Sequence, residues 1–341
     1  MPKVACYPTV FFAFIGIAGI TAVLASVLYG GRGRPDISFL VVGDWGRLGE
    51  FNQSLVAEAM ALRADKLHPD FVLGMGDNFY PNGLGSTHDP AFQQSFANLY
   101  SAPSLQVPWY NVLGNHDYGD GAPPGDAPPS HCASTDQGCY FSPVHQLSWE
   151  LGARDKRWFC ERAFQKSFAN GKVDMFFYDT VPFVQRYYQE KWATNIGGVV
   201  EQSWQGNLLE LETRLARSQA QWKIVIGHHP VYSNGHHNST AELIQHVQPL
   251  LQKYGVQVYF SGHDHNLEYI KLPNQGTHYI ISGAGSKCDR PFTGQTNALF
   301  QWQSSGFVTA CLKEDTMECR FYSIEDNAAS PLYTLTVPRT S

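Results

Sequence analysis

The sequence predicts an α/β fold in which parallel strands alternate with helices, and three observations support this. Five short apolar runs each end at a glycine that is followed by polar side chains. Segments with helical spacing of apolar residues lie between those runs. The C-terminal part, residues 279–337, is rich in strand-forming residues instead. Strands that alternate with helices are joined by right-handed crossovers, which make neighbouring strands parallel.

The five apolar runs have the composition of buried strands. Each is short, rich in β-branched and aromatic residues, and bounded by glycine. The runs span residues 37–42, 71–75, 109–113, 223–226 and 256–261. In an open α/β sheet the ligand crevice lies beyond the carboxyl ends of the strands. We therefore expect the five polar turns to converge on one cleft, with each glycine letting the backbone bend so that the next side chain projects inward.

Three segments between the runs carry helix signals. Residues 52–68 have apolar side chains at helical spacing, and the Asp-Pro pair at 89–90 marks the start of a second helix. Ser239 and Glu242 form a capping box ahead of a third apolar stripe. The chain shows no repeat and no linker that would divide it, so residues 35–341 are expected to form one domain.

Composition and charge restrict the class of protein. Hydrophobic residues make up 43% of the 341 residues and charged residues 16%, with 31 Gly and 20 Pro. This mixture is typical of a compact fold with long loops and excludes a disordered or coiled-coil chain. The formal net charge is −6, so the chain lacks the positive field that holds nucleic acid. We expect no nucleic-acid partner, although this argument does not apply to a small nucleotide.

Residues 1–34 are expected to be a signal peptide or signal-anchor segment rather than part of the fold. Residues 10–28 form an apolar to weakly polar run behind Lys3, which is the layout of a secretory signal. The run exceeds the usual apolar core of about 7 to 15 residues and could cross a bilayer, so an uncleaved anchor is the alternative. Both interpretations send the rest of the chain into the secretory pathway, as a secreted, lumenal or membrane-anchored protein.

The secretory pathway favours N-linked glycans and disulfide bonds. Acceptor patterns begin at Asn52 and Asn238. Of the seven cysteines, Cys6 lies in the targeting segment and an even number remains. Spacing alone does not fix the connectivity. The pairings that we expect are Cys132 with Cys139, Cys311 with Cys319 and, by elimination, Cys160 with Cys288.

The side chains that follow the five runs form the inventory of a metal site. They combine carboxylate, imidazole, amide and phenolate donors, which suit iron, zinc or manganese better than a thiolate-bound metal or calcium. One cation needs fewer donors, and hydrolysis at phosphorus commonly uses two metals about 3.5 to 4 Å apart that share a carboxylate and a hydroxide. The candidate residues are Asp44, Asp77, Tyr80, Asn115, His116, His228, His263 and His265.

Five motifs carry a resemblance to a known family. They read GDWG at 43–46, GDNFY at 76–80, GNHD at 114–117, GHHP at 227–230 and GHDH at 262–265. In order and spacing they resemble the purple acid phosphatases of the calcineurin-like metallophosphoesterase superfamily, especially the small, single-domain, tartrate-resistant type. The resemblance implies a metallophosphoesterase α/β/β/α sandwich with two packed mixed sheets flanked by helices. It also implies a monomeric acid phosphatase that hydrolyses small phosphomonoesters with a metal-bound hydroxide.

Carried over by motif, the resemblance implies which donors hold each ion. Fe(III) would be held by Asp44, Asp77, Tyr80 and His265, and a divalent ion, Fe, Zn or Mn, by Asp77 as a bridge with Asn115, His228 and His263. Phenolate and carboxylates match the hard ferric ion, and phenolate-to-iron charge transfer would give a purple colour. Many related phosphoesterases carry a ligand histidine where this chain has Gly46. Tyr80 would replace that missing donor.

Two histidines are expected to act on the substrate. His116 follows Asn115 and would contact the phosphoryl group or protonate the leaving oxygen. By resemblance His237 is the second, with His236 beside it as the alternative. Asp117 is expected to fix the orientation of His116.

Two other functions use the same scaffold. A phosphodiesterase or nucleotidase is disfavoured by Tyr80 and Gly46, and a non-catalytic binding protein is disfavoured because no ligand position has been lost. We expect His229 to be oriented by its turn rather than to bind metal. The aromatic segment 184–204 is expected to cover the cleft.

Overall fold

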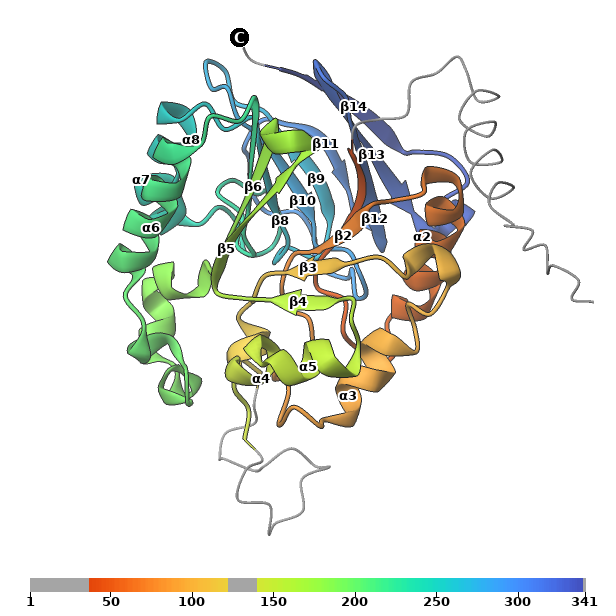
Figure 1. The fold of residues 1–341 in the computed structure, drawn as a ribbon, viewed down its shortest axis with the longest axis vertical. Helices are drawn as coiled ribbons and strands as arrows, with labels where there is room; N and C mark the ends of the chain where they lie inside the picture. The colour runs from red at the N-terminus through yellow and green to blue at the C-terminus, as the bar shows by residue number, and fades with distance from the viewer. Residues whose placement is uncertain (1–36, 122–139, 340–341) are drawn as a thin grey trace, which may run out of the picture. The chain divides into compact units, whose positions relative to one another are not determined.

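Two seven-stranded sheets carry the five predicted strands, as seen in the computed structural model (Figure 1), which describes residues 37–121 and 140–339. The strand orders are β14-β13-β12-β1-β2-β3-β4 and β11-β9-β10-β8-β7-β6-β5. The first sheet consists of β1 (Ile37–Val42), β2 (Phe71–Gly74), β3 (Trp109–Asn111), β4 (Trp158–Cys160), β12 (Gly306–Leu312), β13 (Thr316–Ser323) and β14 (Tyr333–Pro338). The second consists of β5 (Ala163–Phe168), β6 (Val173–Tyr178), β7 (Trp222–Ile226), β8 (Val258–Ser261), β9 (Leu267–Ile270), β10 (His278–Ser282) and β11 (Ala298–Trp302).

Both sheets are mixed, and each has a parallel centre. β1 to β4 run parallel in the first sheet, while β12 joins β1 antiparallel and continues into the hairpins of β13 and β14. β6, β7, β8 and β10 run parallel in the second sheet. The parallel order predicted from strand and helix alternation and the strand-rich C-terminal part are both confirmed. Parallel strands bring their carboxyl ends to one edge, which is where ligands bind in such sheets.

Helices cover the outer faces of the two sheets (Figure 1). Beside the first sheet lie α2 (Gln53–Leu67), α3 (Pro90–Phe92), α4 (Val144–Leu147) and α5 (Trp149–Arg154), and beside the second lie α6 (Trp204–Arg217), α7 (Ala241–His246) and α8 (Gln248–Lys253). On β1, Phe39 and Val41 belong to an apolar cluster shared with the second sheet. Leu40 and Val42 point the other way into a cluster shared with α2. This double burial explains the continuous apolar run and confirms the predicted α/β/β/α layers.

All three predicted helical segments are helical in the structure, but one predicted cap is wrong. α2 coincides with the predicted segment, and the Asp89 carboxylate accepts from Ala91 N at 2.8 Å at the start of α3. The predicted capping box ahead of α7 is wrong. The Ser239 hydroxyl donates to the Ser233 carbonyl at 3.3 Å, and Glu242 accepts from the backbone of the 184–204 segment, so both side chains serve tertiary contacts instead.

The two disulfides that fall within the described residues are not formed. Cys311 and Cys319 lie on adjacent strands, but their register is offset by one residue, so their side chains point to opposite faces of the sheet. Cys160 is buried on β4, whereas the Cys288 thiol donates to the His265 carbonyl at 2.6 Å. All four thiols are free, and these two predicted pairings are wrong.

Several expectations concern parts of the chain outside the described residues. The signal or anchor segment and the Cys132 to Cys139 pairing both lie there. Within residues 37–121 and 140–339, no helix combines the length and apolar character that a membrane span requires. The two glycan-acceptor side chains, Asn52 and Asn238, are exposed.

The aromatic packing between the first sheet and its helices generates a stability prediction. Phe96 is fully buried, and its ring lies 5.2 Å from that of Trp109 and 5.3 Å from that of Trp158. Phe96→Ala should lower the free energy of unfolding by about 3 to 5 kcal/mol, because it removes buried apolar surface and leaves a cavity. Urea titration followed by circular dichroism measures the change. Leu209→Ala, at a side chain that is 65% exposed, is the control, and equal small losses in both variants would contradict this account of the core.

Candidate metal centre

Seven donor side chains meet at the carboxyl ends of strands from both sheets. Asp44 follows β1, Asp77 and Tyr80 follow β2, Asn115 follows β3, His228 follows β7, and His263 and His265 follow β8. Each of these residues is at most 7% exposed. The convergence predicted from the five glycine turns is therefore present, and the two sheets share one site.

The first group of donors surrounds the Tyr80 hydroxyl. It lies 2.9 Å from Asp77 Oδ2, 3.2 Å from Asp44 Oδ1 and 3.1 Å from His265 Nε2. His265 Nε2 is in turn 3.5 Å from Asp44 Oδ1. These are the four side chains that the family resemblance assigns to an Fe(III) site.

The second group surrounds His228 Nε2. This nitrogen lies 3.1 Å from Asn115 Oδ1, 3.2 Å from His263 Nδ1 and 3.5 Å from Asp77 Oδ1. The other ring nitrogen of His228 is 2.8 Å from the Met75 carbonyl, to which it can donate, so Nε2 is free to act as a donor atom for a metal. Asp77 thus presents one oxygen to each group.

Three of the donors adopt a left-handed backbone conformation. The φ angles of Asp44, Asp77 and His263 are 60°, 50° and 68°. Non-glycine residues in this region are uncommon, and such strain clusters at functional sites. The preceding Gly262 allows close approach, because a Cβ there would lie 2.4 Å from Asp44 Oδ2. At Asp44 and His263 the bend therefore occurs at the donor residue, one position later than the sequence predicted, whereas before Asp77 the preceding Gly76 is left-handed as well, with a φ of 87°.

The contact between Gly46 and the following motif explains why this chain has no histidine at position 46. A Cβ on Gly46 would lie 1.7 Å from the Asn78 carbonyl oxygen. Tyr80 N donates to the Gly46 carbonyl at 2.7 Å, which holds the two turns together. The turn that delivers the Tyr80 phenol thus occupies the space that a side chain at position 46 would need.

The electrostatics of the buried acids fit a site for cations. Burial, together with repulsion from Asp77, raises the pKa of Asp44 to about 8. Burial opposes ionisation of Asp77 as well, but the charges of His228 and His116 hold its pKa below the usual range. Burial and the two carboxylates raise the pKa of Tyr80 well above its ordinary value. Cations at this place would offset these costs, and the donor types match a hard ion beside Tyr80 and a divalent ion beside His228.

The contacts of His229 agree with a role in its turn rather than as a ligand. Its Nδ1 lies 2.8 Å from Thr180 Oγ1, and its Nε2 lies 2.9 Å from the Tyr187 hydroxyl. Both ring nitrogens are therefore engaged, although His229 stands close to His228 and His263. Tyr187 belongs to the segment expected to cover the cleft, and that segment forms part of its wall.

His116 lies at the cleft, but Asp117 does not orient it as predicted. His116 Nδ1 is 2.6 Å from the Pro81 carbonyl, and its ring centroid is 4.4 Å from that of Tyr80. The buried Asp117 carboxylate instead accepts from the backbone N–H groups of Asn78 at 2.9 Å and Gly114 at 2.8 Å. Asp117 therefore ties the GDNFY and GNHD turns together, because its carboxylate accepts from a backbone N–H group of each.

Of the two adjacent histidines, His237 faces the cleft and His236 is exposed to solvent. The His237 ring centroid lies 4.3 Å from that of His263, and Arg290 contacts its Nε2. Burial, followed by the charge of Arg290, lowers the pKa of His237 to about 3. Its imidazole is therefore neutral above that pH.

Two buried acids that the sequence analysis did not single out hold the segment 233–237, which carries His237. Asp264 Oδ1 accepts from His237 N at 2.7 Å, and its Oδ2 accepts from Ser233 Oγ at 2.5 Å. Glu268 on β9 accepts from Asn234 N at 3.0 Å. Asp264 stands inside the GHDH motif, which was a usable signal. Glu268 has the sequence context of an ordinary strand residue, so no local pattern identifies it as part of the site.

The donors open into a cavity of about 310 Å³. The lining residues are Arg47, Asp77, Asn115, His116, Asp120, Arg186, Tyr187, His237, His263, His265, Lys287 and Arg290. The four positively charged residues were missed by the sequence analysis. Arg47 directly follows Gly46 and Lys287 stands two positions after Gly285, but arginine and lysine are so common in loops that these positions alone carry little information.

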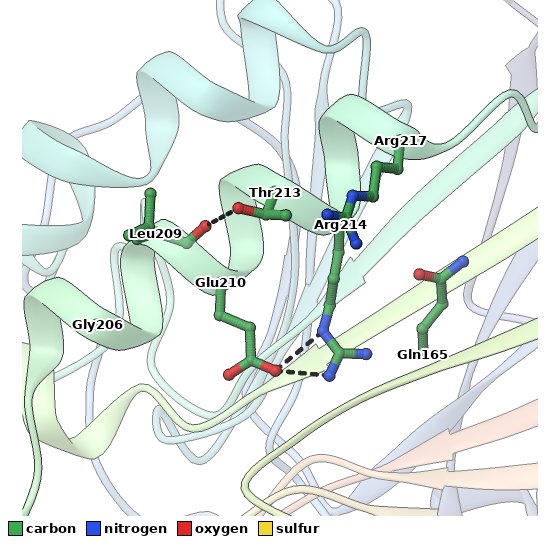
Figure 2. Close-up of a pocket in the computed structure, with 7 residues that line it drawn as sticks. All are labelled: Gln165, Gly206, Leu209, Glu210, Thr213, Arg214 and Arg217. Atoms are coloured by element: carbon green, nitrogen blue, oxygen red, sulfur yellow. Dashed lines mark hydrogen bonds and ion pairs between the residues drawn. The ribbon is translucent and has the colours of Figure 1, made fainter.

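A second hollow, against α6 and β5, differs in character (Figure 2). Its volume is about 560 Å³, and it is lined mainly by one face of α6. Arg214 donates to Glu210 from Nε at 3.1 Å, and Thr213 donates to the Leu209 carbonyl at 2.7 Å. The polar groups of this hollow are thus largely paired within one helix. The candidate site is therefore the other cavity, which the metal-type donors line.

Comparison with known proteins agrees with the fold and the motifs. Residues 37–267 match the calcineurin-like phosphoesterase family, so the chain is a metallophosphoesterase. Purple acid phosphatase 3 of Arabidopsis thaliana is 43% identical and covers 89% of this chain and 79% of its own length. Human tartrate-resistant acid phosphatase type 5 is 31% identical over 75% of this chain and 74% of its own length. The chain belongs to the purple acid phosphatases, which are phosphoric monoester hydrolases.

Solved structures support the fold. A purple acid phosphatase from yellow lupin seeds superposes with a TM-score of 0.60 at 18% identity, over 89% of this chain and 54% of that chain. GAP50, an anchor in the inner membrane complex of Plasmodium, superposes with a TM-score of 0.68 at 22% identity over 89% of both chains. These two likenesses concern the fold alone.

The contact at Gly46 predicts a severe effect of a small substitution. Gly46→Ala should destabilise the protein by about 3 kcal/mol, because the added methyl group overlaps backbone rather than a movable side chain. Thermal or urea unfolding measures the loss. Gly276→Ala is the control, since a Cβ there meets no atom closer than 3.9 Å. A Gly46→Ala protein as stable as the control variant would show that the turn is not closely packed.

The buried Glu268 carboxyl predicts a pH dependence of stability. Burial raises its pKa from 4.5 to about 7, so the folded protein binds this proton more tightly than the unfolded chain. The resulting stabilisation is complete below about pH 4.5 and is lost as the pH rises through about 7. Glu268→Gln has no such proton, so its stability relative to the wild type should rise across this range, on the order of 3 kcal/mol in total. If the free energies of unfolding of the wild type and of Glu268→Gln changed in parallel from pH 4 to 8, the prediction would be contradicted.

Proposed function

We propose that this phosphatase hydrolyses phosphate monoesters at acid pH with two cations in the centre described above. Fe(III) would be held by Asp44, Asp77, Tyr80 and His265, and a divalent ion, Fe, Zn or Mn, by Asp77, Asn115, His228 and His263. The observation that carries the proposal is the position of Asp77, with Oδ2 at 2.9 Å from Tyr80 Oη and Oδ1 at 3.5 Å from His228 Nε2. A carboxylate that faces two donor groups is suited to bridge two ions.

The bound cations would acidify a water molecule that they share and neutralise phosphate oxygens. The protein's own contribution is preorganisation. Backbone N–H groups fix the two carboxylates: His116 N donates to Asp77 Oδ1 at 2.9 Å, and His263 N donates to Asp44 Oδ2 at 2.9 Å. The donors therefore need little rearrangement to bind cations, which keeps the reorganisation cost low.

His116 and His237 would act on the substrate from two sides of the cleft. His116 can donate its Nδ1 proton to Pro81 O, which leaves Nε2 facing the cleft at 4.0 Å from Asp77 Oδ2. In its protonated form that nitrogen can give a proton to the leaving oxygen. His237 stays neutral at acid pH because its pKa is about 3, so we assign it a hydrogen bond to the phosphoryl group rather than proton transfer.

We further propose that the enzyme acts on small phosphomonoesters as a monomer in the secretory pathway. The small size of the cavity, about 310 Å³, favours small substrates. The apolar N-terminal segment of the sequence supports the secretory route, and so do the two exposed glycan-acceptor side chains. A diesterase is disfavoured because Tyr80 and Gly46 fit the purple acid phosphatase pattern.

Substitutions of Asp77 and His116 should separate metal binding from turnover. Asp77→Asn should lose both, because one side chain serves both donor groups. His116→Ala should keep its metals and its purple absorbance but lower kcat by about 10² to 10⁴. Metal analysis, the visible spectrum and phenyl phosphate hydrolysis measure the three quantities. Asp315→Asn, at an exposed carboxylate away from the cleft, is the control. Full activity of either active-site variant would contradict the assigned roles.

A further inference from the structure

Three cations from two loops form one rim of the cleft, which we call the cationic rim: Arg47, Lys287 and Arg290. Arg47 lies in the turn after β1, and the other two lie in the segment after β10. Arg47 Nε donates to Ser286 Oγ at 3.1 Å, which fastens one loop to the other. The rim is therefore part of the fold rather than a chance approach of long side chains.

The rim is held against the candidate metal donors. The Arg47 guanidinium carbon lies 3.4 Å from the centroid of the Tyr80 ring, and Arg290 contacts His237. Two members of the rim approach the same aromatic ring: Arg47 and Lys287 lie 5.7 Å and 5.6 Å from the centroid of the Phe51 ring. An anion beside the transferring phosphoryl group would thus meet this rim directly.

The positive charge of the rim is not balanced locally. In the described part of the chain, neither Arg47 nor Arg290 forms an ion pair with a carboxylate. Lys287 pairs with Asp289 at 2.7 Å, but both side chains are more than a third exposed, so this pair is weak. The cavity is lined by two carboxylates, and Asp120 already accepts from Asn115 at 2.8 Å. In a chain of net charge −6, such an excess of positively charged side chains over carboxylates at one cavity indicates that they bind an anion.

We propose that the cationic rim is a subsite for a second phosphate group carried by the leaving group. The inference rests on the proposed phosphatase function of the cleft and names its preferred substrate class: small organic bisphosphates. The transferring phosphoryl group already has its own partners in the two histidines and the cation site. Guanidinium groups bind phosphate oxygens through paired, charge-assisted hydrogen bonds, and a partly enclosed cleft strengthens them. Arg186, from the segment 184–204, also lines the cavity and adds to the attraction.

A matched pair of substrates tests the subsite. 3-Hydroxypropyl phosphate and propane-1,3-diyl bisphosphate have the same ester bond and differ only in the second phosphate. The wild-type enzyme should have a higher kcat/KM for the bisphosphate, chiefly through a lower KM, and raising the salt concentration should reduce the preference. Lys287→Gln and Arg290→Gln should each reduce the ratio of the two kcat/KM values by about tenfold, the loss of one charge-assisted contact.

The ratio of the two kcat/KM values distinguishes a loss at the subsite from a general loss of activity. Arg290 contacts His237, so its variant is expected to lower kcat for both substrates, and this common factor cancels. Lys287→Arg should keep the preference, because it keeps the charge. The control is Lys172→Gln, at an exposed lysine that also pairs with a carboxylate, Glu314, but lies away from the cleft. Calorimetric binding of methylenediphosphonate against methylphosphonate to the same proteins gives a readout without turnover.

The possible outcomes distinguish a failure of the subsite inference from a failure of the proposed phosphatase function. If the wild-type enzyme hydrolyses neither substrate, the proposed function fails. If it hydrolyses both equally well, or if the rim variants lower both kcat/KM values by the same factor, the phosphatase stands and the subsite is wrong. In the latter case the rim serves the transferring phosphoryl group instead.

Discussion

The carboxylate of Asp77 joins the two groups of donors, and the arrangement of the surrounding loops depends on that contact. One of its oxygens faces Tyr80, which the first sheet supplies, and the other faces His228, which the second sheet supplies. The two sheets must therefore pack so that the ends of β2 and β7 stand side by side. The apolar cluster between the sheets, with Phe39, Ile224 and Phe260 among its members, provides the packing that fixes this distance.

Each motif at the site is held by another motif rather than by its own loop. The Asp44 carboxylate accepts from His263 N, the Asp77 carboxylate accepts from His116 N, and Asp117 accepts from Asn78 N. Buried carboxylates need such donors, because an unsatisfied buried charge is costly. The same bonds stabilise the left-handed backbone at the donor residues, which would otherwise relax. Binding capacity and backbone strain are therefore maintained by one network.

The sequence was informative where chemistry and strand ends coincide, and less so where tertiary contacts decide. The five glycine turns predicted the strands and the donors because buried parallel strands and polar loop residues each have a local signature. β4, β5 and β6 were not anticipated, because β4 and β5 are edge strands that mix buried and partly exposed positions, and the buried β6 is not followed by a glycine. Ser239 and Glu242 have the pattern of a capping box, but in the structure both side chains bind residues outside the helix instead. Cys311 and Cys319 were close enough in sequence to pair, and only the register shows that they face apart. The charges at the cleft, such as Arg290, depend on which loops meet, which one sequence does not reveal.

The close approach at Gly46 bears on how such a centre can change over evolutionary time. With Asn78 O only 1.7 Å from where a Cβ would be, a histidine at position 46 and a tyrosine at position 80 cannot be exchanged one at a time on this backbone. A chain with the histidine would have to move the whole turn outward, and a chain with neither would lack a donor. If Tyr80 binds metal as proposed, exchanging it for a histidine at position 46 would require grafting both turns together, as a single unit.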